Sequence, residues 1–277
     1  MEALDPASLA RWIGALAAAS AVAGFAAGLL GVGGGIITVP VMFQMFTFMG
    51  LPPSLAMQMA VGTSLMTIIP TGFMSARSHS KRGAVDWKLI RSWGPLAFAG
   101  VLVAVVIARH VDGKVLSGVF AVIALIVALD MFLRRNGGQV TDGFPNAVVK
   151  HVIGFFIGGF STLMGIGGGT LSVPILTAVG YQIRNAVGTA SALGPIIAIP
   201  GAIGFVVNGL DVAGRPPFSI GYVNLVAFAL LLPAGLLLPS VGAKVAHMIP
   251  QRSLKLLFAA FLFLTAVRMG WGIVFGK

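Results

Sequence analysis

A glycine-rich motif occurs twice in the chain, and each copy interrupts a long apolar run. The copies read Gly31-Val32-Gly33-Gly34-Gly35-Ile36-Ile37-Thr38-Val39-Pro40 and Gly165-Ile166-Gly167-Gly168-Gly169-Thr170-Leu171-Ser172-Val173-Pro174. Each glycine costs a helix about 1 kcal/mol relative to alanine, so the backbone is expected to unwind at both places. In a membrane, unwound backbone occurs only where it is buried in protein or faces water. Two such breaks in corresponding positions are typical of a transport site.

The helices that start after the two glycine runs would direct unpaired N–H groups and positive dipole ends toward one region, which favours an anion. The predicted substrate-binding residues are Gly33, Gly34, Gly35 and Thr38 of the first copy, and Gly167, Gly168, Gly169 and Ser172 of the second. Pro40 and Pro174 would free backbone carbonyls nearby as structural parts of the motif. The alternative is that the glycines only allow close helix packing.

A second repeated sequence follows each glycine motif. Gly62-Thr63-Ser64 corresponds to Gly188-Thr189-Ala190, which Ser191 follows. The hydroxyls of Thr63, Ser64, Thr189 and Ser191 could complete the shell around a bound anion. They could instead bond back to carbonyls of their own helices, as hydroxyls in membrane helices commonly do.

Composition predicts a polytopic, all-helical membrane protein. The 277 residues are 57% hydrophobic and 9% charged, with a mean hydropathy of +1.00, which excludes a soluble globular protein. The formal net charge is +11, but the basic residues lie between apolar runs instead of on one face. This distribution favours a role in membrane topology over nucleic-acid binding. The lipid bilayer is therefore the expected partner, and no cofactor or metal is predicted.

Ten apolar stretches divide the chain into two repeats of five segments. They run over residues 13–30, 36–48, 55–75, 90–108, 115–133, 148–164, 170–179, 185–207, 220–238 and 254–275. The first repeat is assigned to residues 1–133, the linker to 134–147 and the second repeat to 148–277. The match extends to later positions, since Gly83-Ala84-Val85-Asp86-Trp87 corresponds to Gly221-Tyr222-Val223-Asn224-Leu225.

The second segment of each repeat is too short to cross a bilayer, which takes about 20 residues. Each repeat is therefore expected to begin with a glycine-tipped hairpin and to continue with three crossings, which would invert the second repeat. The basic loop 77–91 would then be cytoplasmic, with both termini periplasmic. A parallel repeat in which each hairpin crosses once gives the same charge bias with both termini inside.

Enzyme chemistry finds little support in the sequence. The glycine motif lacks the sixth glycine of a dinucleotide fingerprint and follows an apolar helical run, and Asp130 is the only acidic residue within a predicted span. A cluster of methionines between Met42 and Met74 could bind Cu(I), although packing explains it better.

The doubled G-x-G-G-G motif, the Val-Gly-Thr after each hairpin and the loop ending at Trp87 resemble the TauE/SafE family of sulfite and organosulfonate permeases. The resemblance covers nearly the whole chain. It implies a secondary transporter for sulfite, sulfoacetate or related organosulfonates in the bacterial inner membrane, driven by an ion gradient. A proton is the candidate coupling ion, and the chain could form a homodimer. A passive anion channel and, with less support, a metal-ion transporter are the alternatives.

Overall fold

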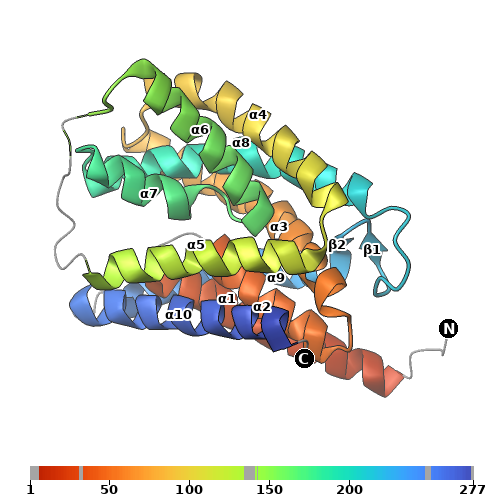
Figure 1. Cartoon of the computed structure of the whole chain (residues 1–277). Coiled ribbons are helices and arrows are strands. Elements are labelled where there is room, and N and C mark those ends of the chain that lie inside the picture. Colours follow the sequence, from red (N-terminus) through yellow and green to blue (C-terminus); the bar gives the residue numbers. More distant parts are fainter. Residues whose placement is uncertain (1–5, 31–33, 134–140, 142, 247–250, 276–277) are drawn as a thin grey trace.

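Ten helices and one short hairpin make up the part of the chain that the structure describes (Figure 1). The structure is a computed structural model that describes residues 6–30, 34–133, 141, 143–246 and 251–275. The helices are α1 (Pro6–Leu30), α2 (Gly35–Phe48), α3 (Pro53–Lys81), α4 (Trp87–His110), α5 (Gly113–Leu133), α6 (Ala147–Met164), α7 (Gly169–Ala178), α8 (Ile183–Asn208), α9 (Leu225–Ala246) and α10 (Gln251–Phe275). Strands β1 (Ser219–Ile220) and β2 (Val223–Asn224) pair antiparallel between α8 and α9. The predicted helical class and the ten segments are confirmed.

Helix length separates the spanning segments from the short ones. Within the described residues, five helices are long and apolar enough to cross a membrane: α3, α4, residues Gly113–Asp130 of α5, α6 and α8. Helices α2 and α7 have 14 and 10 residues. At 1.5 Å per residue they are shorter than the roughly 30 Å hydrocarbon core. The prediction that the second segment of each half is too short to cross is confirmed.

The two halves of the chain are interleaved. Helix α1 packs along α9, and its counterpart α6 packs along α4, while α3 packs on α8 and α5 on α10 (Figure 1). In the predicted repeat, α1 to α5 correspond to α6 to α10. Replacing each helix by its counterpart in the other half turns the α1–α9 pair into the α6–α4 pair. The same exchange leaves the α3–α8 and α5–α10 pairs unchanged. The most extensive helix contacts therefore join one half of the chain to the other.

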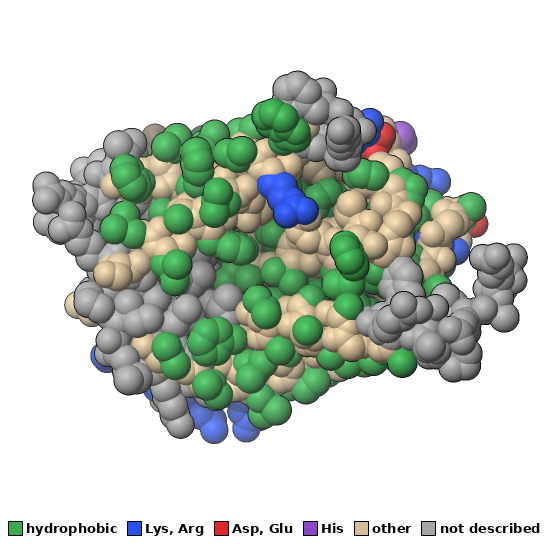
Figure 2. Space-filling model, turned by 90° about the horizontal axis from the view of Figure 1, so that it is seen from below, with side chains coloured by type: hydrophobic (Ala, Val, Ile, Leu, Met, Phe, Trp, Pro, Cys, Tyr) green, Lys and Arg blue, Asp and Glu red, His purple; other side chains and the backbone are tan. Residues whose placement is uncertain are grey.

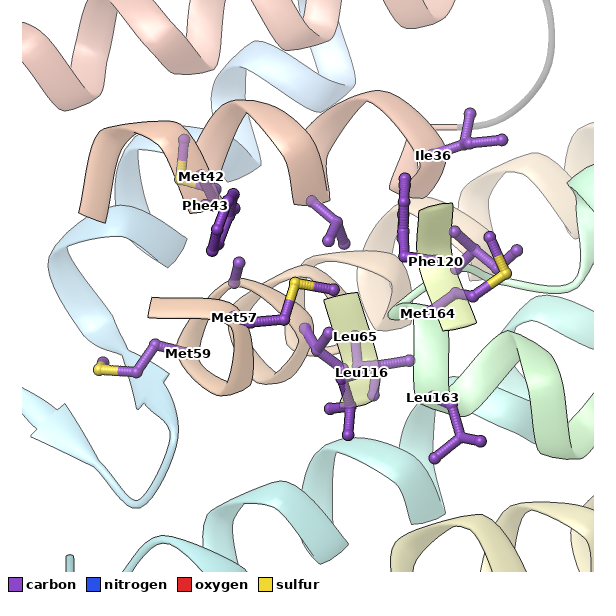
Figure 3. Packing of buried hydrophobic residues seen from close by; sticks show 14 of the residues in the cluster. Ile36, Met42, Phe43, Met57, Met59, Leu65, Leu116, Phe120, Leu163 and Met164 are labelled. Carbon is purple, nitrogen blue, oxygen red and sulfur yellow. The ribbon is translucent and has the colours of Figure 1, made fainter. Parts of the chain in front are cut away.

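The helix that follows the first glycine motif, α2, packs into a cluster of buried apolar side chains. Figure 3 shows Ile36, Met42 and Phe43 of α2 near residues from α3, α5 and α6. Met57 and Met59 are fully buried in the same cluster, and Met45 and Met49 pack against it. These methionines fill the core, as the sequence analysis favoured.

The outward faces of the helices are apolar. Large exposed side chains include Val106 of α4, Val122 of α5 and Leu264 of α10. Figure 2 shows hydrophobic side chains spread over the face that α10 and α1 form. Such continuous apolar surface requires a non-aqueous surrounding, which a bilayer provides.

One predicted segment begins later than expected. The apolar stretch at residues 220–238 was assigned as one segment, but α9 starts at Leu225. Gly221 has φ +56°, and the chain turns there to form the β1–β2 hairpin before the helix begins. Apolar composition alone does not distinguish the four residues after Ile220 from the helix that follows.

Candidate functional site

The second glycine motif forms an unwound tip between α6 and α7. Helix α6 ends at Met164 and α7 begins at Gly169. Gly165 and Gly168 have φ values of +69° and +79°, a region that residues with a side chain rarely adopt. The predicted break in the helix is therefore confirmed. In the first motif α1 ends at Leu30 and α2 begins at Gly35, while Gly33 lies outside the described residues.

The two tips contact each other inside the protein. A Cβ atom added at Gly35 would lie 2.8 Å from Ile166 Cα and 2.9 Å from the Gly165 carbonyl oxygen. The Ser64 hydroxyl of α3 donates a 2.7 Å hydrogen bond to that same carbonyl. The starts of α2 and α7 are thus brought to one place, and α3 holds the second tip there.

A cavity of about 260 Å³ lies beside the two tips, and we call it the tip cavity. Its volume is slightly below the roughly 300–1,000 Å³ typical of pockets for drug-sized ligands, so it suits a smaller molecule. Its described lining comes from α1, α2, α3, the second tip, α7, α8 and α9: Ala23, Gly24, Gly34, Gly35, Thr38, Ser64, Thr67, Ile68, Thr71, Gly72, Ser75, Gly167, Gly169, Thr170, Val173, Val187, Ala190, Ser191, Gly194, Leu231 and Gly235.

Two hydroxyls in this lining have protons available for a ligand. Thr38 and Thr170 are 7% and 2% exposed, and neither side chain makes a hydrogen bond to another described residue. Each lies in the first turn of its helix, beside backbone N–H groups that have no partner within the helix. The start of α2 and the start of α7 therefore offer hydroxyl and amide donors to the same cavity.

The other hydroxyls in the lining already use their protons. Thr67 and Thr71 donate to carbonyls one turn back on α3, at 2.9 and 2.8 Å. Ser75 donates to Ser191, which in turn donates to Val187. Because a hydroxyl has one proton and two lone pairs, Thr67, Thr71 and Ser75 can only accept from a ligand.

Seven of the predicted binding residues line the tip cavity, namely Gly34, Gly35, Thr38, Ser64, Gly167, Gly169 and Ser191. Gly168 and Ser172, at the start of α7, are not in the described lining. The Ser172 hydroxyl is fully buried and has no hydrogen-bond partner among the described residues. A Cβ atom at Gly168 would lie 3.8 Å from that hydroxyl. Pro40 and Pro174 lie within α2 and α7.

Thr63 and Thr189 are not in the described cavity lining, and each contacts the other half of the chain. The Thr63 hydroxyl oxygen accepts a 3.0 Å hydrogen bond from the Asn224 backbone N–H. The Thr189 hydroxyl oxygen accepts a 2.9 Å bond from the Asp86 backbone N–H. We call these contacts the Asn224 junction and the Asp86 junction. Asp86 also caps α4, and Asn224 caps α9.

The Asp86 junction carries an ionisable group. The Tyr181 hydroxyl donates a 2.8 Å hydrogen bond to the Asp86 carboxylate. Partial burial acts to raise the Asp86 pKa, but the bonds from Leu89, Tyr181 and Lys88 outweigh it and hold the pKa below its usual value. Burial and this carboxylate raise the pKa of Tyr181 to about 12.

Sequence analysis missed the hydroxyl row on α3. Thr67, Thr71 and Ser75 recur every four residues, which places them on one face of the helix. This spacing within an apolar span was a readable signal. Thr170 was also missed, although it follows the glycine run directly.

The fold and the tip cavity define a multi-pass membrane protein with an internal polar site at two helix breaks, which is the architecture of a membrane transporter. The family model for the sulfite exporter TauE/SafE matches residues 16–269. The chain belongs to the TauE/SafE family of membrane transporters, and it is not an enzyme.

A bacterial and an archaeal relative match this chain over most of their lengths. A probable membrane transporter protein of Haemophilus influenzae is 34% identical, over 90% of this chain and 94% of the relative. A probable membrane transporter protein of Methanocaldococcus jannaschii is 26% identical, over 87% and 89% of the two chains. No solved structure matches the chain.

Proposed function

We propose that the protein is a secondary transporter that moves sulfite, sulfoacetate or related organosulfonates by alternating access around the tip cavity. The observation that carries this proposal is the convergence of two helix starts on one internal cavity. Hydroxyl donors at Thr38 and Thr170 and the free N–H groups of α2 and α7 can surround an oxyanion there. The family description names sulfite export, which agrees with an oxyanion as the cargo.

We also propose that residues 1–133 and 148–277 are inverted repeats joined by residues 134–147, with both termini on the periplasmic side of a bacterial inner membrane. Three features support inversion: the exchangeable helix pairs, the matching junctions and the positions of the chain ends. Figure 1 shows β1–β2 at the end of the molecule where α1 begins and toward which α10 runs, while α4 begins at the opposite end. Loop 77–91 would then face the cytoplasm.

Single cysteines test this orientation directly, because the chain has no native cysteine. Ser78→Cys, in the last turn of α3 and within the basic segment 77–91, should react with an impermeant maleimide only in inverted vesicles. Ser219→Cys in the β1–β2 hairpin should react only in intact cells whose outer membrane has been permeabilised. The opposite pattern, or labelling of both from one side, would contradict the inverted arrangement.

Transport is measured best in proteoliposomes that contain the purified protein. Sulfite or an organosulfonate should enter in a saturable way and should exchange with unlabelled substrate inside, with and without an imposed proton gradient. A passive channel would conduct without saturation or exchange acceleration. Absence of both flux and binding for every sulfur oxyanion would refute the proposal.

Gly34→Ala separates a binding role of the first tip from a packing role. The added methyl group would meet only the Thr38 hydroxyl, at an ordinary 3.7 Å, and Gly34 lines the cavity. We expect normal thermal stability and at least a tenfold loss of transport, about 1.4 kcal/mol, because the methyl occupies space beside the anion donors. Gly94→Ala on α4 is the control, since its methyl would also meet a single atom at 3.5 Å. Equal transport in the two variants would remove Gly34 from the binding site.

A further inference from the structure

None of the described residues that line the tip cavity has an ionisable side chain. Every lining residue falls within residues 12–76, 152–183, 185–210 or 216–243, and none of these segments contains Asp, Glu, Lys, Arg or His. A bound anion therefore meets only backbone amides, hydroxyls and helix dipoles.

This composition limits the charge that the cavity can hold. The cost of moving an ion out of water rises with the square of its charge, so a dianion costs about four times as much to bury as a monoanion of similar size. Each helix N-terminus is equivalent to roughly +0.5 charge, so the starts of α2 and α7 together offset about one negative charge. A second negative charge would gain no further compensation from a cationic side chain, because the described lining supplies none.

The cavity also has separate donor and acceptor sides. Thr38 and Thr170 offer protons at the starts of α2 and α7, whereas Thr67, Thr71 and Ser75 offer lone pairs along one face of α3. A ligand that is an anion at one oxygen and a hydroxyl at another would satisfy both sides. A fully deprotonated oxyanion would place negative oxygens against the lone pairs of the α3 row.

We propose that the tip cavity selects oxyanions that carry one negative charge and keep an O–H group, such as hydrogensulfite, and that the proton moved across the membrane is the substrate's own. This inference rests on the proposed function and narrows it. Sulfoacetate, with a second ionised group, is then a poor ligand. Coupling to a proton gradient needs no titratable residue in the cavity.

In the sequence, the ionisable residues of the lining helices lie toward the helix ends. They are Arg11 of α1, Arg77, His79 and Lys81 of α3, Arg184 of α8 and Lys244 of α9, and helices α2 and α7 contain none. Because these groups could add a pH dependence of their own, the test needs a ligand that does not titrate. Isethionate, a monoanion with a hydroxyl, serves this purpose.

The experiment measures ligand affinity of the purified full-length protein as a function of pH, by calorimetry and by the rise in melting temperature. Affinity for total sulfite should fall about tenfold per pH unit above the second ionisation of sulfite, while affinity for isethionate stays constant. Sulfate and sulfoacetate should bind at least about 100-fold more weakly than isethionate, a difference of roughly 2.7 kcal/mol. Constant or rising sulfite affinity, equal binding of sulfate, or a requirement for Na⁺ would overturn the inference and leave sulfur-anion transport standing. Failure of all five ligands, including methanesulfonate, would refute both.

Single substitutions test which hydroxyls act as donors and which as acceptors for the ligand. Thr38→Val and Thr170→Val should each lower the affinity for isethionate and for methanesulfonate by about tenfold, because both ligands need the hydroxyl donors. Thr71→Val should lower the affinity for isethionate but not for methanesulfonate, because methanesulfonate has no O–H group to donate. The matched controls are Thr47→Val and Thr177→Val, whose hydroxyls bond back to their own helices α2 and α7. Equal losses of both ligands in Thr71→Val would contradict the acceptor role of the α3 row.

Discussion

The Asn224 and Asp86 junctions use the same hydrogen bond with different chemistry around it. In both, a threonine hydroxyl oxygen on a central helix accepts from a backbone N–H that precedes a helix of the other half. Around Asn224 the remaining partners are neutral: the amide donates to Pro217 and Ser219. Around Asp86 a carboxylate accepts from Tyr181 and lies beside Lys88.

The comparison separates the part of each junction that helix packing requires from the part that is free to differ. The threonine acceptor is present at both ends, because an unpaired backbone N–H at a buried helix crossing is costly. The capping residue is free to be Asn or Asp, since either caps a helix well. The charged version, Asp86, lies within the segment that has many basic residues, 77–91.

The largest effect is expected from the glycines that precede the two threonines. A Cβ atom at Gly62 would lie 2.6 Å from the Tyr222 carbonyl oxygen, and one at Gly188 would clash with the Ala84 carbonyl. Both neighbours are backbone atoms, so Gly62→Ala and Gly188→Ala should each lower the free energy of unfolding by about 1–3 kcal/mol. Denaturant unfolding in detergent measures this, with Gly94→Ala as control. A loss at one glycine only would show that the junctions are not mechanically equivalent.

A smaller effect is expected from the threonines themselves. Thr63→Val and Thr189→Val keep the volume but leave a backbone N–H without its acceptor, which should cost about 1–2 kcal/mol of stability. The sequence analysis instead placed both hydroxyls around the substrate, in which case affinity would fall and stability would not. Measuring unfolding and substrate affinity on the same two variants decides between a junction and a binding role. Thr177→Val reports the cost of removing a hydroxyl that only bonds back to its helix.

The smallest effect concerns the charge at the Asp86 junction. Asp86→Asn makes its polar group resemble that of Asn224. The amide oxygen can keep the cap of α4, and the amide nitrogen then donates to the Tyr181 hydroxyl oxygen, which reverses the bond at that position. Because the Asp86 pKa is lowered in the folded protein, the unfolded chain takes up its proton first as the pH falls. The contribution is therefore present at neutral pH and is lost below about pH 4. Since Asp86 is partly exposed, we expect a change of about 0.5 kcal/mol or less at neutral pH and a flatter acid limb of the stability curve. An unchanged acid limb would show that other carboxylates determine it.

The sequence predicted where the helices and breaks lie better than it predicted which helices and side chains contact each other. Runs of apolar residues locate helices, and glycine runs locate the breaks, because both are local properties. Thr63 and Thr189 were recognised as a pair from the repeat, but no local pattern says that each hydroxyl accepts from the opposite half. The cavity lining depends on which faces of seven elements meet, which is a property of packing. The α3 hydroxyl row was nevertheless visible as a four-residue period.

The hydroxyl row on α3 has no counterpart on α8. The positions that correspond to Thr67, Thr71 and Ser75 in the second repeat are Leu193, Ile197 and Gly201. These three residues are not in the described lining, to which α8 contributes Val187, Ala190, Ser191 and Gly194. A ligand in the cavity therefore meets the hydroxyl row of α3 on one side and a mostly apolar α8 surface, with the single hydroxyl of Ser191, on the other. Because the two sides of the site differ in polarity, an elongated sulfonate would bind in it in a single orientation. The sulfonate end of every molecule would then lead, or trail, in each passage through the protein.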